Sequence, residues 1–190
     1  MIFQRQFKFY ASHRNQLLAD KCACLHGHRY EVTFQLEVQR GQQGDQNTTV
    51  LFADLDFIGD RIRERFDHSC MLDFNDPLLP VLLKFARSDS PFWKFTILPF
   101  PTSAENLAFV VFDLILTILA ESRVGVLKHI TLRETDSTLI VYDQESWEND
   151  YSKLSGVRKV SKFVLNPHHT QLANINNLFQ EYWNTGIVGL

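Results

Sequence analysis

The segment DKCACLHGHRYEVTFQLEV, residues Asp20 to Val38, contains the clearest strand pattern of the chain. Its second half alternates apolar and polar residues, which predicts a β-strand with one buried face. The apolar positions of this strand are Tyr30, Val32, Phe34, Leu36 and Val38. His26 and His28 have the same parity, so both are expected on the buried face if the strand extends back through them.

A second alternating stretch, IFQRQFKFYASH, comes earlier in the chain, at residues 2–13. Phe3, Phe7, Phe9 and Ala11 share one parity, and His13 falls on it too. Two such strands in succession most simply form an antiparallel pair, in which the end of the first lies beside the start of the second. The pairing would bring His13 close to the two histidines of the next strand.

Three histidines that converge on one side of a hairpin have a specific chemical use. Zinc binds neutral imidazole nitrogen, and three protein ligands leave a fourth position for water or substrate, as in catalytic zinc sites. A lone histidine of this kind is most often an ordinary half-buried residue. The His26-Gly27-His28 motif, preceded by a cysteine and paired with His13, therefore favours a metal site. Gly27 would let a substrate or the opposing backbone approach closely.

The remaining pattern predicts an α+β fold, namely an antiparallel four-stranded sheet with two helices on one face and a C-terminal extension. Apolar residues at helical spacing predict a helix in FADLDFIGDRIRERF, residues 52–66, and a long apolar helix follows a Thr102-x-x-Glu105 capping box. WKFTILPF, residues 93–100, is expected to be a further strand. The segment VLKHITLRETDSTLIVYDQ predicts two strands joined at Asp136-Ser137. We expect one domain over residues 1–144 and an extension over residues 145–190, ending in an amphipathic helix.

Composition excludes several classes of protein. The chain has 190 residues, a net charge of −3 and three cysteines. This charge does not favour nucleic acid or an anionic membrane as a partner, and an odd number of cysteines near histidines favours thiol or metal chemistry over disulfides. The N-terminal residues show no secretory pattern, and the most apolar run, Leu107 to Ala120, is too short to span a bilayer. A cytoplasmic protein is expected.

Five motifs, in order, carry a resemblance over about residues 1 to 143. They are FYASH, CACLHGHRY, RFDHSCML, PTSAENLA and LRETDSTLIVY. Together they resemble the 6-pyruvoyltetrahydropterin synthase and 6-carboxytetrahydropterin synthase family. The resemblance implies the tunnelling fold of that family, in which the sheet is antiparallel, and it implies zinc bound by His13, His26 and His28.

The resemblance also implies catalytic residues. Cys22 matches the family's reactive cysteine, and its three-residue spacing from His26 is typical of the 6-carboxytetrahydropterin enzymes. Asp67 and His68 match the catalytic aspartate and histidine. The alternative for this pair is a helix C-terminal cap, where a histidine interacts favourably with the helix dipole. Cys24 has no counterpart in the family, and a small, partly buried residue is the expectation there.

Substrate-binding residues follow from two further motifs. Glu134 matches the family's pterin anchor, because a carboxylate accepts the adjacent N–H groups of the ring in a bidentate manner. A buried ion pair with arginine or lysine is the alternative for Glu134. The resemblance places Thr102 and Glu105 beside the pterin pocket, in a motif with one extra residue here. Leu51 stands where the family commonly has aspartate.

The expected function is that of a zinc-dependent lyase. Its substrate would be 7,8-dihydroneopterin triphosphate, and its products 6-carboxytetrahydropterin, acetaldehyde and triphosphate, on the route to 7-deazaguanines such as queuosine. The alternatives are a 6-pyruvoyltetrahydropterin synthase, a dihydroneopterin-cleaving enzyme, and a non-catalytic pterin- or metal-binding protein. The resemblance implies a homo-oligomer, a trimer or hexamer, with pockets between subunits. His168-His169 invites a metal interpretation, but an exposed pair in a loop is expected.

Overall fold

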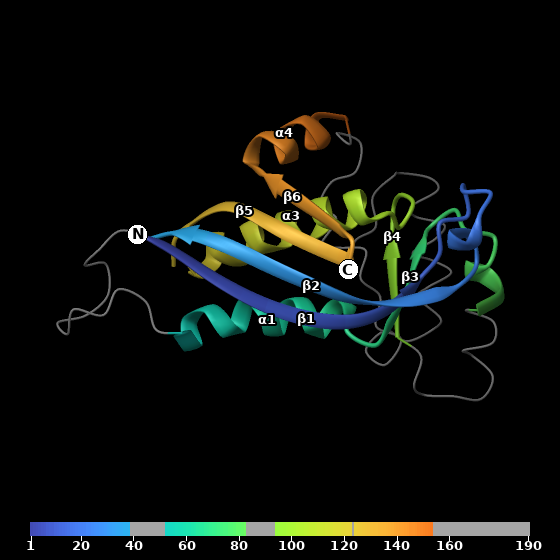
Figure 1. Cartoon of the computed structure of the whole chain (residues 1–190), viewed down its shortest axis with the longest axis horizontal. Coiled ribbons are helices and arrows are strands. Elements are labelled where there is room, and N and C mark those ends of the chain that lie inside the picture. The colour runs from blue at the N-terminus through green and yellow to red at the C-terminus, as the bar shows by residue number, and fades with distance from the viewer. Residues whose placement is uncertain (39–51, 83–93, 123, 154–190) are drawn as a thin grey trace.

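A computed structural model describes residues 1–38, 52–82, 94–122 and 124–153. One sheet runs through this part of the chain, in the strand order β4-β3-β1-β2-β5-β6 (Figure 1). The strands are β1 (Ile2–His13), β2 (His26–Glu37), β3 (Ser69–Asp73), β4 (Phe95–Leu98), β5 (Val126–Thr135) and β6 (Thr138–Asp143). The helices are a 3-10 turn (Lys21–Ala23), α1 (Phe52–Phe66), α3 (Ala104–Ser122) and α4 (Gln144–Lys153).

The predicted hairpin of β1 and β2 is confirmed and forms the centre of the sheet. The two strands pair antiparallel from Ile2 opposite Glu37 to His13 opposite His26. The alternating residues of both strands are buried on one face, and Phe9, Tyr30, Val32 and Phe34 are completely inaccessible. The sequence pattern therefore determined the register, because a shift by one residue would move these side chains to the other face.

The prediction of an antiparallel four-stranded sheet is confirmed in part, because β1, β2, β5 and β6 pair antiparallel but are not the whole sheet. The sheet has six strands, because β3 and β4 extend it beyond β1, and both pair parallel to their neighbours. The expected strand at residues 93–100 is β4, but β3 was not expected. All five residues of β3 are buried, so its sequence SCMLD has no alternation to mark it. Parallel strands covered on both faces commonly have this character.

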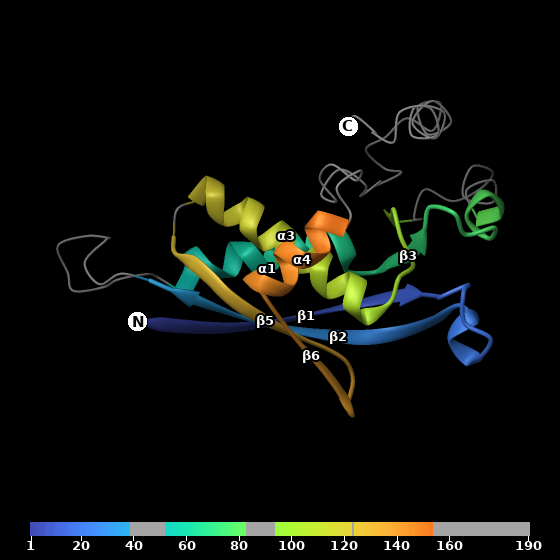
Figure 2. The same cartoon turned by 90° about the horizontal axis from the view of Figure 1, so that it is seen from above.

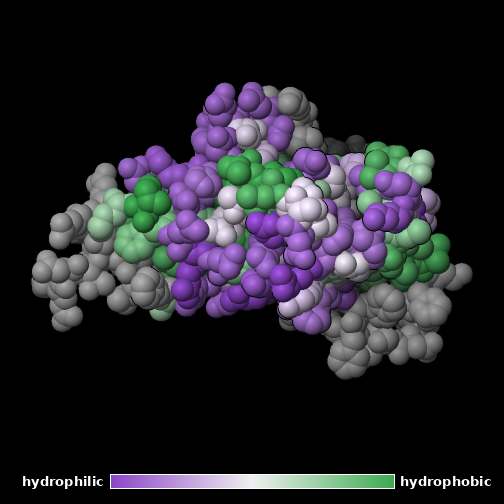
Figure 3. All heavy atoms as spheres, in the orientation of Figure 1, coloured by the Kyte–Doolittle hydropathy of each residue, from purple (hydrophilic) through white to green (hydrophobic). Residues whose placement is uncertain are grey.

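The two long helices lie on the same face of the sheet, as predicted (Figure 2). Helix α1 packs through its predicted stripe of Leu55, Ile58, Ile62 and Phe66, each at most 1% exposed. Helix α3 is apolar on nearly all sides and is the most deeply buried helix in the described chain. The opposite face of the sheet is largely hydrophilic, with several apolar patches, one of which lies over β6 (Figure 3). Leu139 and Val141 are exposed there.

Helix α4 lies where the extension was predicted to begin, and it packs against α3 and β6. Trp147 donates its indole N–H to Asp113 of α3 at 3.1 Å, and Tyr142 of β6 donates its hydroxyl to Asp150 at 2.7 Å. The expected amphipathic helix, Leu51 and the His168-His169 pair lie outside the described residues. No helix in the described ranges is long and apolar enough to cross a membrane.

Candidate metal and ligand site

The three histidines of the hairpin form one cluster. His13 ends β1, His26 begins β2 directly opposite it, and His28 lies opposite Ala11. One nitrogen of each ring lies within 4.8 Å of one nitrogen of each of the others. The ring centroids are 4.6 Å apart for His13 and His26, 5.2 Å for His13 and His28, and 4.9 Å for His26 and His28. The spacing predicted from strand parity therefore brings these side chains together.

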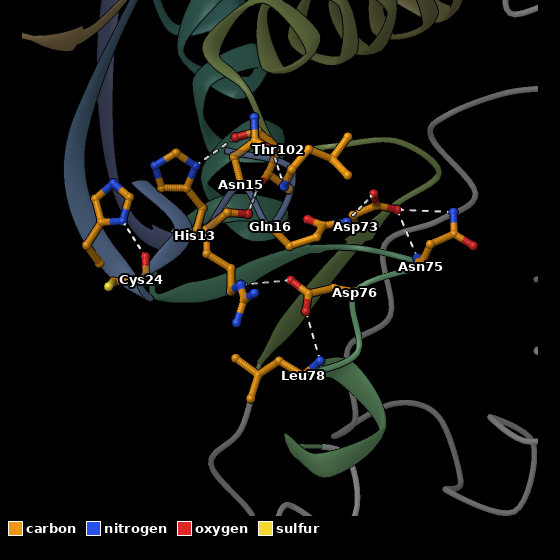
Figure 4. A network of polar contacts seen from close by, with 12 residues as sticks. His13, Asn15, Gln16, Cys24, Asp73, Asn75, Asp76, Leu78 and Thr102 are labelled. Atoms are coloured by element: carbon orange, nitrogen blue, oxygen red, sulfur yellow. Dashed lines mark hydrogen bonds and ion pairs between the residues drawn. The ribbon is translucent and has the colours of Figure 1, made fainter. Parts of the chain in front are cut away.

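Backbone carbonyls orient two of the rings. Nδ1 of His13 lies 2.7 Å from the carbonyl oxygen of Thr102, and Nδ1 of His26 lies 2.7 Å from that of Cys24 (Figure 4). Because a carbonyl only accepts, both Nδ1 atoms carry the proton and donate it. A ring that carries its proton on Nδ1 alone offers Nε2 as a potential metal ligand. Carbonyl partners of this kind commonly orient metal-binding histidines.

The cluster fits a metal ion on its own chemistry. Nε2 of His13 is buried and makes no hydrogen bond to the described residues. A buried imidazole nitrogen without a partner is costly, and a metal would satisfy it. Burial lowers the pKa of His13 and of His28, which favours the neutral form that binds metal.

Glu134 of β5 lies beside the cluster, on the face predicted from strand parity. Its Oε1 accepts a hydrogen bond from the hydroxyl of Tyr30 at 3.2 Å and lies 3.4 Å from Nε2 of His13. The contact with His13 is within ion-pair distance but is not oriented as a hydrogen bond. Among the described residues, no arginine or lysine pairs with Glu134. The alternative, a buried ion pair with one of these residues, is therefore not observed in this part of the chain. Burial and Glu134 together raise the pKa of Tyr30, so its hydroxyl stays protonated and donates.

Cys22 lies in the 3-10 turn between β1 and β2. Asp20 caps this turn by accepting the backbone N–H of Cys22 at 2.7 Å. Burial, followed by the negative charge of Asp20, raises the pKa of the Cys22 thiol. A raised pKa favours the protonated thiol over the thiolate. Cys24 is exposed, and its carbonyl rather than its sulfur serves the cluster, through His26.

Asp67 and His68 form a second polar pair just beyond α1. Asp67 accepts the backbone N–H of Tyr10 at 2.8 Å and contacts Nδ1 of His68 at 2.8 Å. Burial alone would raise the pKa of Asp67, but these two contacts outweigh it and lower that pKa. His68 has a left-handed backbone, with φ at 57°, and its side chain is 81% exposed. Helices frequently end with a residue in this left-handed conformation. The backbone of His68 therefore agrees with the alternative interpretation, a helix C-terminal cap.

The pair is not joined to the cluster within one chain. Tyr10, which contacts both Asp67 and the ring of His68, has the opposite parity to His13 on β1. Among the described residues, no hydrogen bond or ion pair links Asp67 or His68 to Cys22 or to the three histidines. Within the described chain, Asp67 and His68 therefore make no polar contact with Cys22, although His68 and His28 line the same groove.

Two adjoining grooves meet at Gly27, His28 and Arg29. The first continues to Tyr10, His68 and Lys94 and has a volume of about 590 Å³; the second continues to Glu31, Arg133 and Glu134 and has a volume of about 430 Å³. A Cβ atom at Gly27 would meet only the carbonyl of Ala11, at an ordinary 3.5 Å, so the fold itself does not require glycine there. The grooves give a ligand access to the edge of the cluster.

Thr102 and Glu105 do not form the predicted capping box. The side chain of Ser103 accepts the N–H of Asn106 at 3.3 Å, so Ser103 caps α3. The hydroxyl of Thr102 instead donates to the carbonyl of Arg14 at 2.7 Å. Thr102 is buried and orients His13 through its carbonyl, whereas Glu105 is exposed.

Sequence reasoning missed two residues near the site. The ammonium group of Lys94 donates to the carbonyls of Asp67 at 2.8 Å and Arg63 at 3.3 Å, and so caps α1 before the Asp67-His68 pair. The hydroxyl of Tyr30 has its partner Glu134 far away in the chain. Only the strand parity of Tyr30 and Glu134, which places both on the buried face, could have suggested their contact.

Comparisons with known proteins agree with this architecture. The family model described as 6-pyruvoyl tetrahydropterin synthase matches residues 2–145. An uncharacterised protein from Wolinella succinogenes superimposes with a TM-score of 0.61 at 21% identity, over 76% of this chain and 99% of its own. A 6-pyruvoyl tetrahydropterin synthase from Plasmodium vivax gives 0.50 at 14% identity, over 74% of this chain and 96% of its own. No curated protein matches the chain in sequence. At these identities the solved structures establish the fold alone.

Proposed function

Because this chain belongs to the 6-pyruvoyl tetrahydropterin synthase family, we propose that it is a zinc-dependent lyase acting on 7,8-dihydroneopterin triphosphate. Its products would be 6-carboxy-5,6,7,8-tetrahydropterin, acetaldehyde and triphosphate, which would place it on a route to queuosine-type 7-deazaguanines. The observation that carries the proposal is the histidine cluster with a carboxylate beside it. Nε2 of His13 lies 3.4 Å from Oε1 of Glu134, so a metal and a pterin anchor would be neighbours.

His13, His26 and His28 would hold the ion through ring nitrogens. A zinc ion bound there would lower the pKa of a hydroxyl that coordinates it. Three histidines of this kind leave the fourth position open to such a hydroxyl. Zinc is our preference over iron because an open three-histidine site is typical of catalytic zinc, although imidazole suits both metals.

Glu134 would bind the pterin ring by accepting two adjacent N–H groups, a planar match that fixes the ring's orientation. Cys22 would move the proton at the side-chain carbons of the substrate. Because the pKa of its thiol is raised here, Cys22 would begin as a proton donor, and it would need a base nearby to become a thiolate. Asp67 would orient His68, through their 2.8 Å contact, as the group that exchanges protons with the substrate's hydroxyl or leaving fragment.

We further propose that Asp67 and His68 complete the site of a second copy of the chain. Two observations support this: the side chain of His68 is 81% exposed, and neither residue contacts Cys22 within the described chain. The proposed homo-oligomer, a trimer or hexamer, would bring the pair of one subunit to the cluster of another. Mixing an inactive Cys22→Ala protein with an inactive Asp67→Asn protein would then restore part of the activity, because some mixed sites would contain both groups.

The three-residue gap between Cys22 and His26 supports the 6-carboxy product over the 6-pyruvoyl product. The test is incubation of the zinc-loaded protein with dihydroneopterin triphosphate, with products identified by mass spectrometry. We expect 6-carboxytetrahydropterin and acetaldehyde, lost in Cys22→Ala and kept in the matched control Cys24→Ala. A 6-pyruvoyl or aldehyde product would support the proposed site but contradict the proposed reaction. Bound pterin without turnover would favour the non-catalytic alternative.

A further inference from the structure

Tyr30 is held in a fixed position beneath the histidine cluster. Its side chain is completely buried. Its ring stacks on Phe9, with centroids 5.0 Å apart, and presents edge-on contacts to His13 at 6.0 Å and His28 at 5.8 Å. A ring packed between a core phenylalanine and two proposed ligands has no space to move, so the position of its hydroxyl is determined by the core.

The hydroxyl of Tyr30 acts on one oxygen of Glu134. Oε1 accepts the hydroxyl at 3.2 Å, and the same atom lies 3.4 Å from Nε2 of His13. In a tetrahedral zinc site with bonds of about 2.0–2.1 Å, neighbouring ligand atoms lie about 3.3–3.4 Å apart. Oε1 is therefore close enough to His13 to become a fourth ligand, which would close the site.

We propose that Tyr30 is a positioning residue whose hydrogen bond holds Glu134 off the metal, so that the fourth position stays open and the carboxylate stays free to bind a ligand. A carboxylate oxygen that already accepts a fixed neutral donor is a poorer metal ligand, because coordination must compete with that hydrogen bond. Glu134 also lines the second groove, so a planar ligand bound in that groove would have the carboxylate within its walls. The inference rests on the proposed metal site but not on the identity of the substrate.

Two variants isolate this hydrogen bond. Tyr30→Phe removes only the hydroxyl and keeps the ring that packs on Phe9. The matched control is Tyr142→Phe, because Tyr142 is also a buried tyrosine whose hydroxyl donates to a carboxylate, that of Asp150 at 2.7 Å, next to α4. Neither change removes a proposed metal ligand.

The experiment uses the full chain loaded with cobalt(II), whose visible spectrum reports the number and kind of its ligands, and azide as the probe for an open position. In the unmodified protein and in Tyr142→Phe, azide should bind and change the spectrum. In Tyr30→Phe, we expect azide affinity to fall by about tenfold or more, since a hydrogen bond to a charged group is of that size. Adding Glu134→Gln to Tyr30→Phe should restore azide binding, because the competing carboxylate is gone.

Three results would overturn the inference. Azide binding equal in Tyr30→Phe and the unmodified protein would show that the hydroxyl does not control the fourth position. A loss that Glu134→Gln fails to restore would show that Tyr30 acts through packing alone. A protein that binds no cobalt at the histidines would remove the metal site and the inference with it. Failure of the lyase reaction alone, with these spectra as expected, would contradict the proposed substrate and leave the role of Tyr30 supported.

Discussion

Zinc should stabilise the fold itself, because the cluster holds a buried nitrogen that nothing in the described chain satisfies. Nε2 of His13 is inaccessible and without a hydrogen bond, on a residue that is 5% exposed. A ligand that binds the folded state alone adds about 4.1 kcal/mol to the free energy of unfolding at a concentration 1,000 times its Kd. For a domain of this size each 1 kcal/mol raises Tm by about 2–4 °C, so we expect a rise of about 8–16 °C.

The assay is thermal unfolding of the full chain in chelator and in a zinc buffer of known free concentration. His13→Ala should lose nearly all of the zinc-dependent rise, because it removes the most buried ligand. His129→Ala is the control, since it removes an imidazole from β5 that lies outside the cluster, and it should keep the full rise. If zinc left the Tm of the unmodified protein unchanged, or still raised that of His13→Ala, His13 would not be a zinc ligand that stabilises the fold.

Three further changes follow from particular contacts. Asp67→Asn should lower the free energy of unfolding by about 1 kcal/mol at pH 7. Because the pKa of Asp67 is lowered in the folded state, this loss should shrink as the pH falls below the unfolded value of 3.8. Urea titrations between pH 7 and pH 3 measure the loss, and a constant loss would contradict the prediction. The free energy of unfolding should be about 1 kcal/mol higher in His68→Gly than in His68→Ala, since the φ of 57° at this position favours glycine. His68→Gly should nevertheless abolish turnover. Equal stability of the two variants would show that the backbone at His68 is not strained. Gly125→Ala should destabilise by about 1–3 kcal/mol, because its Cβ would lie 2.9 Å from the carbonyl oxygen of Glu37; an unchanged urea midpoint would count against it.

The centre of the fold could be predicted because its residues alternate. In β1 and β2 one face is buried and the other is not, so parity alone determined the register and the meeting of His13, His26 and His28. The same parity placed Glu134 on the buried face. Strand β3 could not be found in this way, because both of its faces are buried and SCMLD shows no period.

Other features depend on contacts between distant segments. Thr102 and Ser103 are both residues that favour helix N-caps, and only the contact of Thr102 with the Arg14 carbonyl decides between them. The position of Asp67 and His68 depends on a left-handed turn and on Tyr10 in a strand 57 residues away. A period of two or of 3.6 residues contains no information about such pairs.

We propose that the three histidines hold the metal and that the neighbouring thiol does not. X-ray absorption at the zinc edge of the full, zinc-loaded chain identifies the ligands. We predict three imidazole nitrogens at about 2.0–2.1 Å, one further oxygen or nitrogen ligand and no sulfur, with one imidazole lost in His13→Ala. A sulfur at about 2.3 Å, which would come from a cysteine such as Cys22 or Cys24, or fewer than three imidazoles, would show that the three histidines alone do not form the site.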